Sequence, residues 1–241
     1  MKTTLKIWIL PALLLAFVSA AHAASVTIGS YGTGDSSMGN SNTALYYAGY
    51  STSATGTFSV PFPFGSHTSY DVSPNSAWHS AISGSSWVSN EFNGSEDSSG
   101  EPIGYYKYTT GFTAAAGSYS GVLNLMADDT AEVLLNGNVI ANFSAPGTDS
   151  DCEQHAPNCT AVDTIDFSAS LFSGLDANTL TIIDYQGVNN TPLGVDFSAT
   201  LTPTSPAPEP SSLLLLGTGL LGMAFIAFRK AKTVRLGQLS M

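Results

Sequence analysis

Strict alternation of apolar and polar residues in two stretches of the chain leaves little choice of local fold. The stretches read TIDFSASL from Thr164 and VDFSATL from Val195. Successive side chains of a β-strand point to opposite faces, so a period of two gathers the apolar residues on one face. In the second stretch this places Phe197 on a buried face and Asp196 on a solvated one. Both stretches are therefore predicted to be strands with one buried face.

Further strand patterns occur along the chain, at 105–112, 121–127 and 179–185, and a first strand begins within 25–28. Asn136-Gly137 stands between two apolar runs and predicts a tight hairpin turn, because both residues tolerate positive φ angles. Only 73–82 favours a short helix, with Ser73 as its cap. Many short strands joined by polar turns predict an all-β fold, an antiparallel β-sandwich or jelly roll, over residues 24–201.

The first 23 residues have the pattern of a signal peptide. Lys2 and Lys6 precede an apolar run over 7–18, and Ala21 and Ala23 flank His22 as an A-x-A cleavage site. A membrane anchor or a buried core helix is the alternative, but the run is too short to span a bilayer. We predict that signal peptidase removes residues 1–23 and that the rest of the chain is exported.

The predicted exported segment is strongly acidic. Between Ala24 and Ala207 a single cation, Lys107, stands against seventeen carboxylates, which gives a net charge of −16. Binding to phosphate groups depends on clustered Lys and Arg residues, and this segment contains no such cluster. The composition excludes nucleic acid as a partner, and it excludes adhesion of the folded surface to anionic lipid.

The C-terminal end changes in character at residue 202. Residues 202–210 hold four prolines and predict a stiff, extended linker. Residues 211–228 are predicted to form a single transmembrane helix. The sixteen uncharged residues 213–228 cover about 24 Å, against a hydrocarbon core of about 30 Å, so the anchor is marginal. The basic tail, 229–241, is predicted to stay in the cytoplasm and to leave the sandwich outside.

The order of these parts resembles the PEP-CTERM sorting signal of Gram-negative bacteria. It consists of Pro208, Glu209 and Pro210, then the apolar segment, then the basic flank Arg229, Lys230, Lys232 and Arg235. The resemblance implies an inner-membrane precursor that an exosortase cleaves near the motif and passes to the cell surface or beyond. It also implies an association with exopolysaccharide. The basic residues here are spaced rather than consecutive, and an ordinary anchor after a Pro-rich linker is the alternative.

The two cysteines, Cys152 and Cys159, are predicted to pair, because an exported protein meets an oxidising compartment. A free-thiol nucleophile is the alternative. Ser36 lies in a Gly-Asp-Ser sequence, but no histidine has the spacing of a partner base, so we read it as a loop residue. No nucleophile–base pair and no zinc-ligand spacing is present. We therefore predict that the protein is not an enzyme.

Residues 117–140, GSYSGVLNLMADDTAEVLLNGNVI, resemble a hairpin of galactose-binding-like jelly rolls and of the sugar-binding domains of yeast flocculins. The resemblance implies that Asp128 and Asp129 hold a calcium ion that binds sugar hydroxyls. Turn-forming aspartates are the alternative. Trp78 and Trp87 either stack on sugar rings or pack in the core. Two functions follow: a structural or exopolysaccharide-associated surface protein, and a calcium-dependent carbohydrate-binding module.

Overall fold

The computed structural model describes residues 24–30, 39–59, 67–95, 101–144, 152, 155–204 and 216–228. The chain divides into two units, of which Ala23–Ser205 is the larger. The described residues of that unit form eleven strands: β1 (Val26–Gly29), β2 (Ser41–Ser51), β3 (Thr68–Asp71), β4 (Val88–Ser89), β5 (Gly104–Ala114), β6 (Gly117–Asp128), β7 (Thr130–Leu135), β8 (Asn138–Ala141), β9 (Asp163–Leu171), β10 (Gly174–Gln186) and β11 (Gly194–Pro203).

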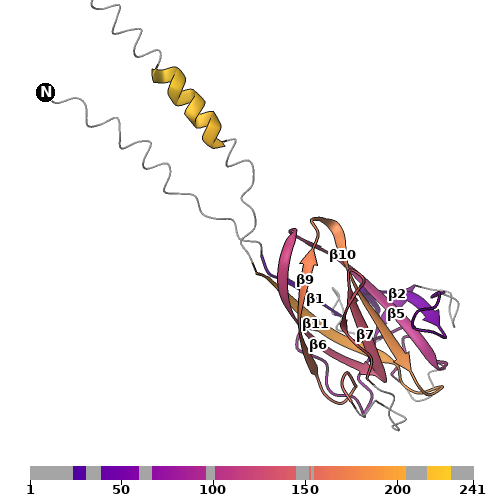
Figure 1. The fold of residues 1–241 in the computed structure, drawn as a ribbon. Coiled ribbons are helices and arrows are strands. Elements are labelled where there is room, and N and C mark those ends of the chain that lie inside the picture. The colour runs from indigo at the N-terminus through magenta and orange to yellow at the C-terminus, as the bar shows by residue number, and fades with distance from the viewer. Residues whose placement is uncertain are drawn as a thin grey trace, which may run out of the picture. The chain divides into compact units, whose positions relative to one another are not determined.

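The strands form one sheet in the order β8-β7-β10-β5-β2-β3-β4-β11-β6-β9, with β1 added to β11, and these strands pair antiparallel. This sheet folds over on itself, so that β9, β6, β11 and β1 lie in one layer and β7, β10, β5 and β2 in the other (Figure 1). The short strands β3 and β4 connect the two layers. The prediction of an all-β antiparallel sandwich is confirmed.

The core lies between the two layers and follows the predicted alternation. On β11, Val195, Phe197, Ala199 and Leu201 are all fully buried. Leu123 and Leu125 of β6 face the same space, and so does Ile182 of β10. Burial of each large apolar side chain contributes about 1.5–3 kcal/mol, so these rows supply much of the fold's stability. The predicted hairpin is also present, with positive φ angles at Asn136 and Gly137.

A second apolar cluster lies on the outer face of β6. It consists of Val72, Trp78, Trp87, Met126, Cys152 and Cys159. The two tryptophan rings stack with centroids 4.3 Å apart, and both side chains are buried. Their role is therefore core packing, the second of the two interpretations. The loops on either side of Trp78 and the disulfide cover this face of the sheet, where sequence alternation alone predicts solvent.

Two predictions made from the local sequence pattern are wrong, because loops cover this face of the sheet. Residues 73–82 form a turn and loop rather than a helix, because Asn75 Oδ1 accepts a hydrogen bond from Ala77 N and Trp78 packs onto the sheet. Asp196 is fully buried rather than solvated. Its carboxylate accepts hydrogen bonds from Ser85 Oγ at 2.5 Å, Ile82 N at 2.8 Å and Ser30 Oγ at 3.0 Å. These donors satisfy a charge that the covering loop has removed from water.

The last strand of the sandwich and a separate helix lie in the C-terminal part of the chain. β11 runs to Pro203, two residues beyond the predicted end of the sandwich, and Pro203 pairs with Tyr119 at the end of the ladder. A proline is tolerated at a strand end because few ladder bonds depend on it there. Residues 216–228 form an α-helix. Among the described residues, no helix has the length and apolar character needed to cross a membrane.

Candidate functional site

The two aspartates of the sequence pattern lie where the chain passes from one layer of the sandwich to the other. Asp128 ends β6 and pairs with Gly194 of β11, whereas Thr130 begins β7 and pairs with Tyr185 of β10. Asp129 is the single residue between the two strands, and the Asp128–Asp129 peptide bond is cis. The position is thus fixed from both layers of the sheet.

Both carboxylates are buried and oriented by the surrounding protein. Asp128 is 1% exposed and Asp129 is 2% exposed. Asp128 Oδ2 accepts a hydrogen bond from Trp78 Nε1 at 2.5 Å, and Asp129 Oδ2 accepts one from Gly187 N at 2.6 Å. The N–H of Asp129 donates to Tyr185 O at 3.0 Å. Hydrogen bonds thus hold both carboxylates in place at the crossing between the layers.

A third aspartate, which the sequence analysis missed, lies beside them. Asp184 of β10 is fully buried, and neither of its carboxylate oxygens makes a hydrogen bond of ordinary geometry within the described residues. Burial raises its pKa well above the usual range, and the charges of Asp128 and Asp129 raise it further. The backbone N–H of Tyr185 offsets part of this increase. These three residues are called the acidic cluster below.

The sandwich segment contains a single Lys or Arg side chain. Lys107, the single cation between residues 24 and 207, lies over the ring of Phe58 at 5.3 Å from the ring centroid. Within the part of the chain that the structure describes, no group of three or more His, Cys, Asp or Glu side chains is arranged to hold a metal ion by itself.

A second buried acidic pair was also missed. Glu91 is 2% exposed and Glu101 is 1% exposed, although they belong to separate loops. Burial raises the pKa of Glu91 to about 7, and the charge of Glu101 contributes to the increase. Burial raises the pKa of the Tyr47 hydroxyl, and the nearby charges of Glu101 and Glu91 raise it further. The stability of this region is therefore expected to depend on pH.

The predicted disulfide is confirmed. Cys152 and Cys159 are joined with their Cα atoms 5.7 Å apart, and neither sulfur is available as a nucleophile. The other predicted site residues lie outside the described residues: the cleavage-site residues Ala21 and Ala23, Ser36, the motif Pro208, Glu209 and Pro210, and the basic flank Arg229, Lys230, Lys232 and Arg235.

Comparison with known families settles the nature of the C-terminal segment. Residues 206–230 match the PEP-CTERM protein-sorting motif. The chain carries a PEP-CTERM sorting signal. The matched range contains the Pro-Glu-Pro residues, the helix at 216–228 and the first two cations, Arg229 and Lys230, whereas Lys232 and Arg235 follow it. The PEP-CTERM signal marks the protein as exported and as a substrate of an exosortase.

Solved structures similar to the sandwich include carbohydrate-binding domains. A Podospora anserina GH26-CBM35 β-(1,4)-mannanase is 16% identical over 76% of this chain, with a TM-score of 0.36, and the match spans 28% of the mannanase. A CBM35 from Paenibacillus barcinonensis is 10% identical over 74% of this chain and 99% of its own, with a TM-score of 0.33. The PA14 sugar-binding domain from an RTX adhesin is 13% identical over 76% of this chain and 90% of its own, with a TM-score of 0.27. No curated protein matches the chain in sequence.

Proposed function

We propose that the sandwich is the extracellular part of a surface protein that an exosortase releases from the inner membrane into an exopolysaccharide matrix. The observation that carries the proposal is the PEP-CTERM motif at 206–230, which follows a proline-rich linker and precedes basic residues. In the precursor, residues 211–228 cross the inner membrane, with snorkelling cations extending the short apolar run. The tail 229–241 stays in the cytoplasm.

The proposed role in the matrix is structural or adhesive rather than catalytic. The disulfide occupies both cysteines, and Asp196 is held by three hydrogen-bond donors beneath a loop. These two features give both cysteines and Asp196 structural roles. An acidic surface also suits a matrix protein, because its net charge keeps it soluble and separate from anionic lipid.

Fractionation of a producing host tests this proposal. The wild-type chain is expected in the polysaccharide fraction outside the cell. A variant with Pro208→Ala and Glu209→Ala is expected to stay in the inner membrane, because the exosortase no longer recognises it. A matched control, Pro203→Ala, alters a proline on the sandwich side of the linker and is expected to behave like the wild type. Equal release of the motif variant and the wild type would contradict the proposal.

A second candidate function is calcium-dependent carbohydrate binding at Asp128 and Asp129. The observation that favours it is the burial of both carboxylates at one crossing between the layers, beside the buried Asp184. The two aspartates would supply carboxylate oxygens, with loop carbonyls and waters completing six to eight ligands. A calcium ion bound there would offset the repulsion of the acidic cluster and offer open coordination positions to sugar hydroxyls.

Thermal melting with and without calcium tests the metal. Millimolar calcium is expected to raise the melting temperature, since a ligand at a hundredfold excess over its Kd stabilises the folded state by about 2.7 kcal/mol. Asp128→Asn with Asp129→Asn is expected to abolish this rise, whereas Asp163→Asn with Asp166→Asn, on the outer strand β9, leaves it unchanged. Magnesium is expected to substitute poorly. Superimposable curves in calcium and in chelator would rule out the metal, and glycan binding that survives a chelator would rule out a calcium-dependent sugar site.

A further inference from the structure

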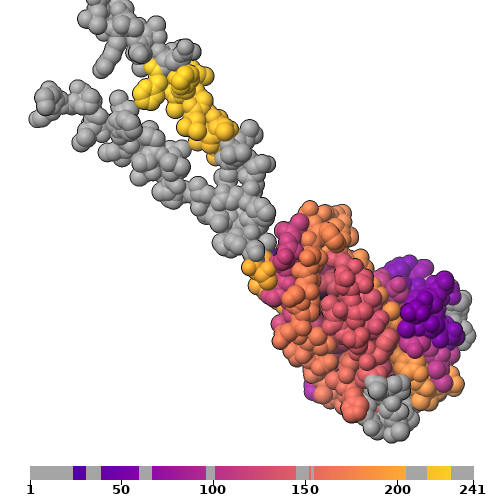
Figure 2. Space-filling view, viewed as in Figure 1, coloured from indigo at the N-terminus to yellow at the C-terminus, as the bar shows by residue number. Residues whose placement is uncertain are grey.

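One pocket of the sandwich differs in its chemistry from the acidic cluster. It is a pocket of about 650 Å³ on the sheet surface, formed by β2, β3 and β5. Its lining contains no Asp, Glu, Lys or Arg side chain, and hydroxyl groups dominate it: Ser41, Thr43, Thr68, Thr109 and Thr110. Residues 39–59, which include β2, form part of the outer surface of the domain, in violet in Figure 2. The pocket is therefore neutral and polar.

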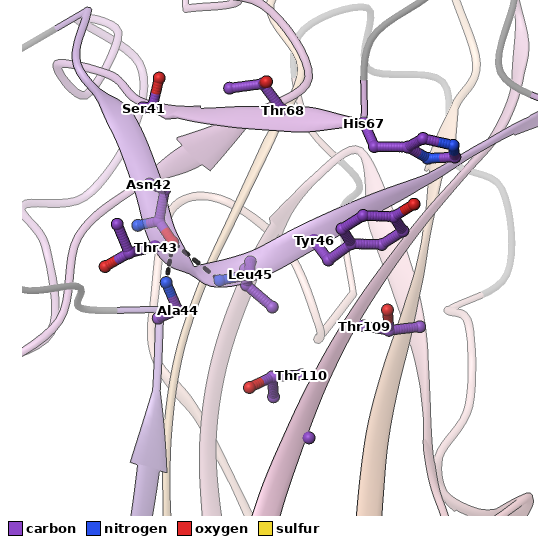
Figure 3. Close-up of a pocket in the computed structure, with 11 residues that line it drawn as sticks. Ser41, Asn42, Thr43, Ala44, Leu45, Tyr46, His67, Thr68, Thr109 and Thr110 are labelled. Atoms are coloured by element: carbon purple, nitrogen blue, oxygen red, sulfur yellow. Dashed lines mark hydrogen bonds between the residues drawn. The ribbon is translucent and has the colours of Figure 1, made fainter. Parts of the chain in front are cut away.

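An irregularity of β2 creates the hollow. Asn42 pairs with Ser69 and Tyr46 with Thr68, so that β2 contains three more residues than β3 over the same interval. The extra residues, Thr43, Ala44 and Leu45, line the pocket. Asn42 Oδ1 holds this bend by accepting hydrogen bonds from Ala44 N at 2.9 Å and Leu45 N at 2.8 Å, as Figure 3 shows. The pocket is a fixed feature of the fold rather than a gap between loops.

An aromatic pair forms one wall of the pocket. Tyr46 is 49% exposed, and its ring stacks on the ring of His67, with centroids 4.6 Å apart and planes inclined by 15° (Figure 3). His67 Nδ1 makes a hydrogen bond with Tyr47 O at 2.9 Å, and Tyr47 N donates to His67 O at 3.1 Å. Tyr47 itself is buried in the core. The exposed pair is thus anchored through the backbone of a core residue and loses little freedom when a ligand binds.

The chemistry of the lining selects the class of ligand. Phosphate, sulfate and uronic acids require a cation, and a protein whose sandwich segment carries −16 repels them. A metal ion requires carboxylates, which the lining does not contain. The flat apolar face of a sugar ring packs against an exposed tyrosine ring, while threonine hydroxyls both donate and accept hydrogen bonds to sugar hydroxyls.

We propose that the pocket around Tyr46 and His67 binds neutral pyranose units of a polysaccharide, and does so without calcium. The inference rests on the proposed association with exopolysaccharide and gives that association a place in the fold. It is separate from the acidic cluster, because none of the lining residues belongs to that cluster. Tyr46 supplies the stacking surface, and Thr109, directly opposite Tyr46 on β5, supplies hydroxyl contacts.

Native affinity electrophoresis of the full chain tests the inference, with EDTA present throughout. The neutral probes are galactomannan, hydroxyethylcellulose and dextran, and alginate is the anionic probe. At least one neutral probe is expected to retard the wild type, and alginate is not. Tyr46→Ala is expected to weaken that binding at least tenfold. Tyr46→Trp, which keeps an aromatic surface, and Phe172→Ala, which removes an aromatic side chain that is 56% exposed elsewhere, are expected to bind like the wild type.

The outcomes separate this inference from the proposals before it. Retardation by no neutral probe overturns it, and so does equal binding by Tyr46→Ala and the wild type. If Tyr46→Ala does not fold, judged by its melting curve, Thr109→Val takes its place and is expected to weaken binding while keeping the shape of the wall. Asp128→Asn with Asp129→Asn is expected to bind normally in this assay. If the wild-type protein is found in the matrix but the Tyr46→Ala variant binds the neutral probes like the wild type, the inference about the pocket is overturned. The proposed function is then unaffected.

Discussion

Glu91 is the buried carboxylate whose removal gives the clearest test of the electrostatics. It begins the turn at 91–94, is 2% exposed, and its Oε1 atom has no hydrogen-bond partner within the described residues. Burial first, and then the charge of Glu101, raise its pKa from 4.5 to about 7. The substitution Glu91→Gln keeps the shape of the side chain and removes the charge.

The sign of the effect follows from proton counting. Between pH 4.5 and about 7 the folded state holds a proton on Glu91 that the unfolded state has released, so the free energy of unfolding falls as pH rises through this window. Each pKa unit corresponds to 1.36 kcal/mol, which for this difference gives about 3.4 kcal/mol in total. Solvent screening reduces an interaction of this kind, and we expect about half of that value, about 1.7 kcal/mol.

Urea unfolding, followed by tryptophan fluorescence at pH 4.5 and pH 8, measures the effect. Glu91→Gln and the wild type are expected to have similar stability at pH 4.5, whereas at pH 8 the variant is more stable by about 1.7 kcal/mol. Glu132→Gln, at a half-buried position on β7, controls for the simple loss of one carboxylate. If Glu91→Gln is less stable than the wild type at pH 8, Glu91 has a partner that stabilises its charge, and the reasoning is wrong.

Three further predictions concern the packing of the domain, each measured by urea unfolding. Phe197→Ala removes a fully buried ring between the layers and is expected to cost about 3–5 kcal/mol; a cost below 1 kcal/mol would mean that the layers are not packed through it. Cys152→Ser with Cys159→Ser is expected to cost about 2–3 kcal/mol, and free thiols in peptide maps of the exported wild type would refute the pairing. Ser85→Ala removes a donor to the buried carboxylate of Asp196 and is expected to cost about 1.5–3 kcal/mol, while Ser168→Ala on β9 serves as its exposed control.

Features that depend on neighbouring residues could be predicted from the sequence. The alternation in β9 and β11, the turn at Asn136-Gly137 and the short disulfide loop are properties of a few consecutive residues. The PEP-CTERM signal is also a linear pattern, and its match at 206–230 agrees with the prediction. The fold class and the sorting signal could therefore be predicted from local sequence patterns.

Features that arise from the meeting of distant segments could not be predicted in the same way. The alternation of side chains along β11 shows that Asp196 and Phe197 lie on opposite faces of the sheet. It cannot show that a loop covers the outer face. Glu91 and Glu101 belong to separate described segments, and their closeness shows only in the effect of the charge of Glu101 on the pKa of Glu91. Asp184 had a usable signal, because it continues the inward row of Leu180 and Ile182 on β10. A carboxylate in phase with buried apolar residues is a candidate for a functional site.

The intact mass of the surface form, purified from an exosortase-containing host, tests the sorting route most directly. The chain is predicted to begin at Ala24 and to end near Pro210, and deletion of the host exosortase is predicted to leave a precursor that retains the C-terminal segment. A dominant surface form that still contains residues 225–235 would contradict exosortase processing, and with it the proposed release into the matrix.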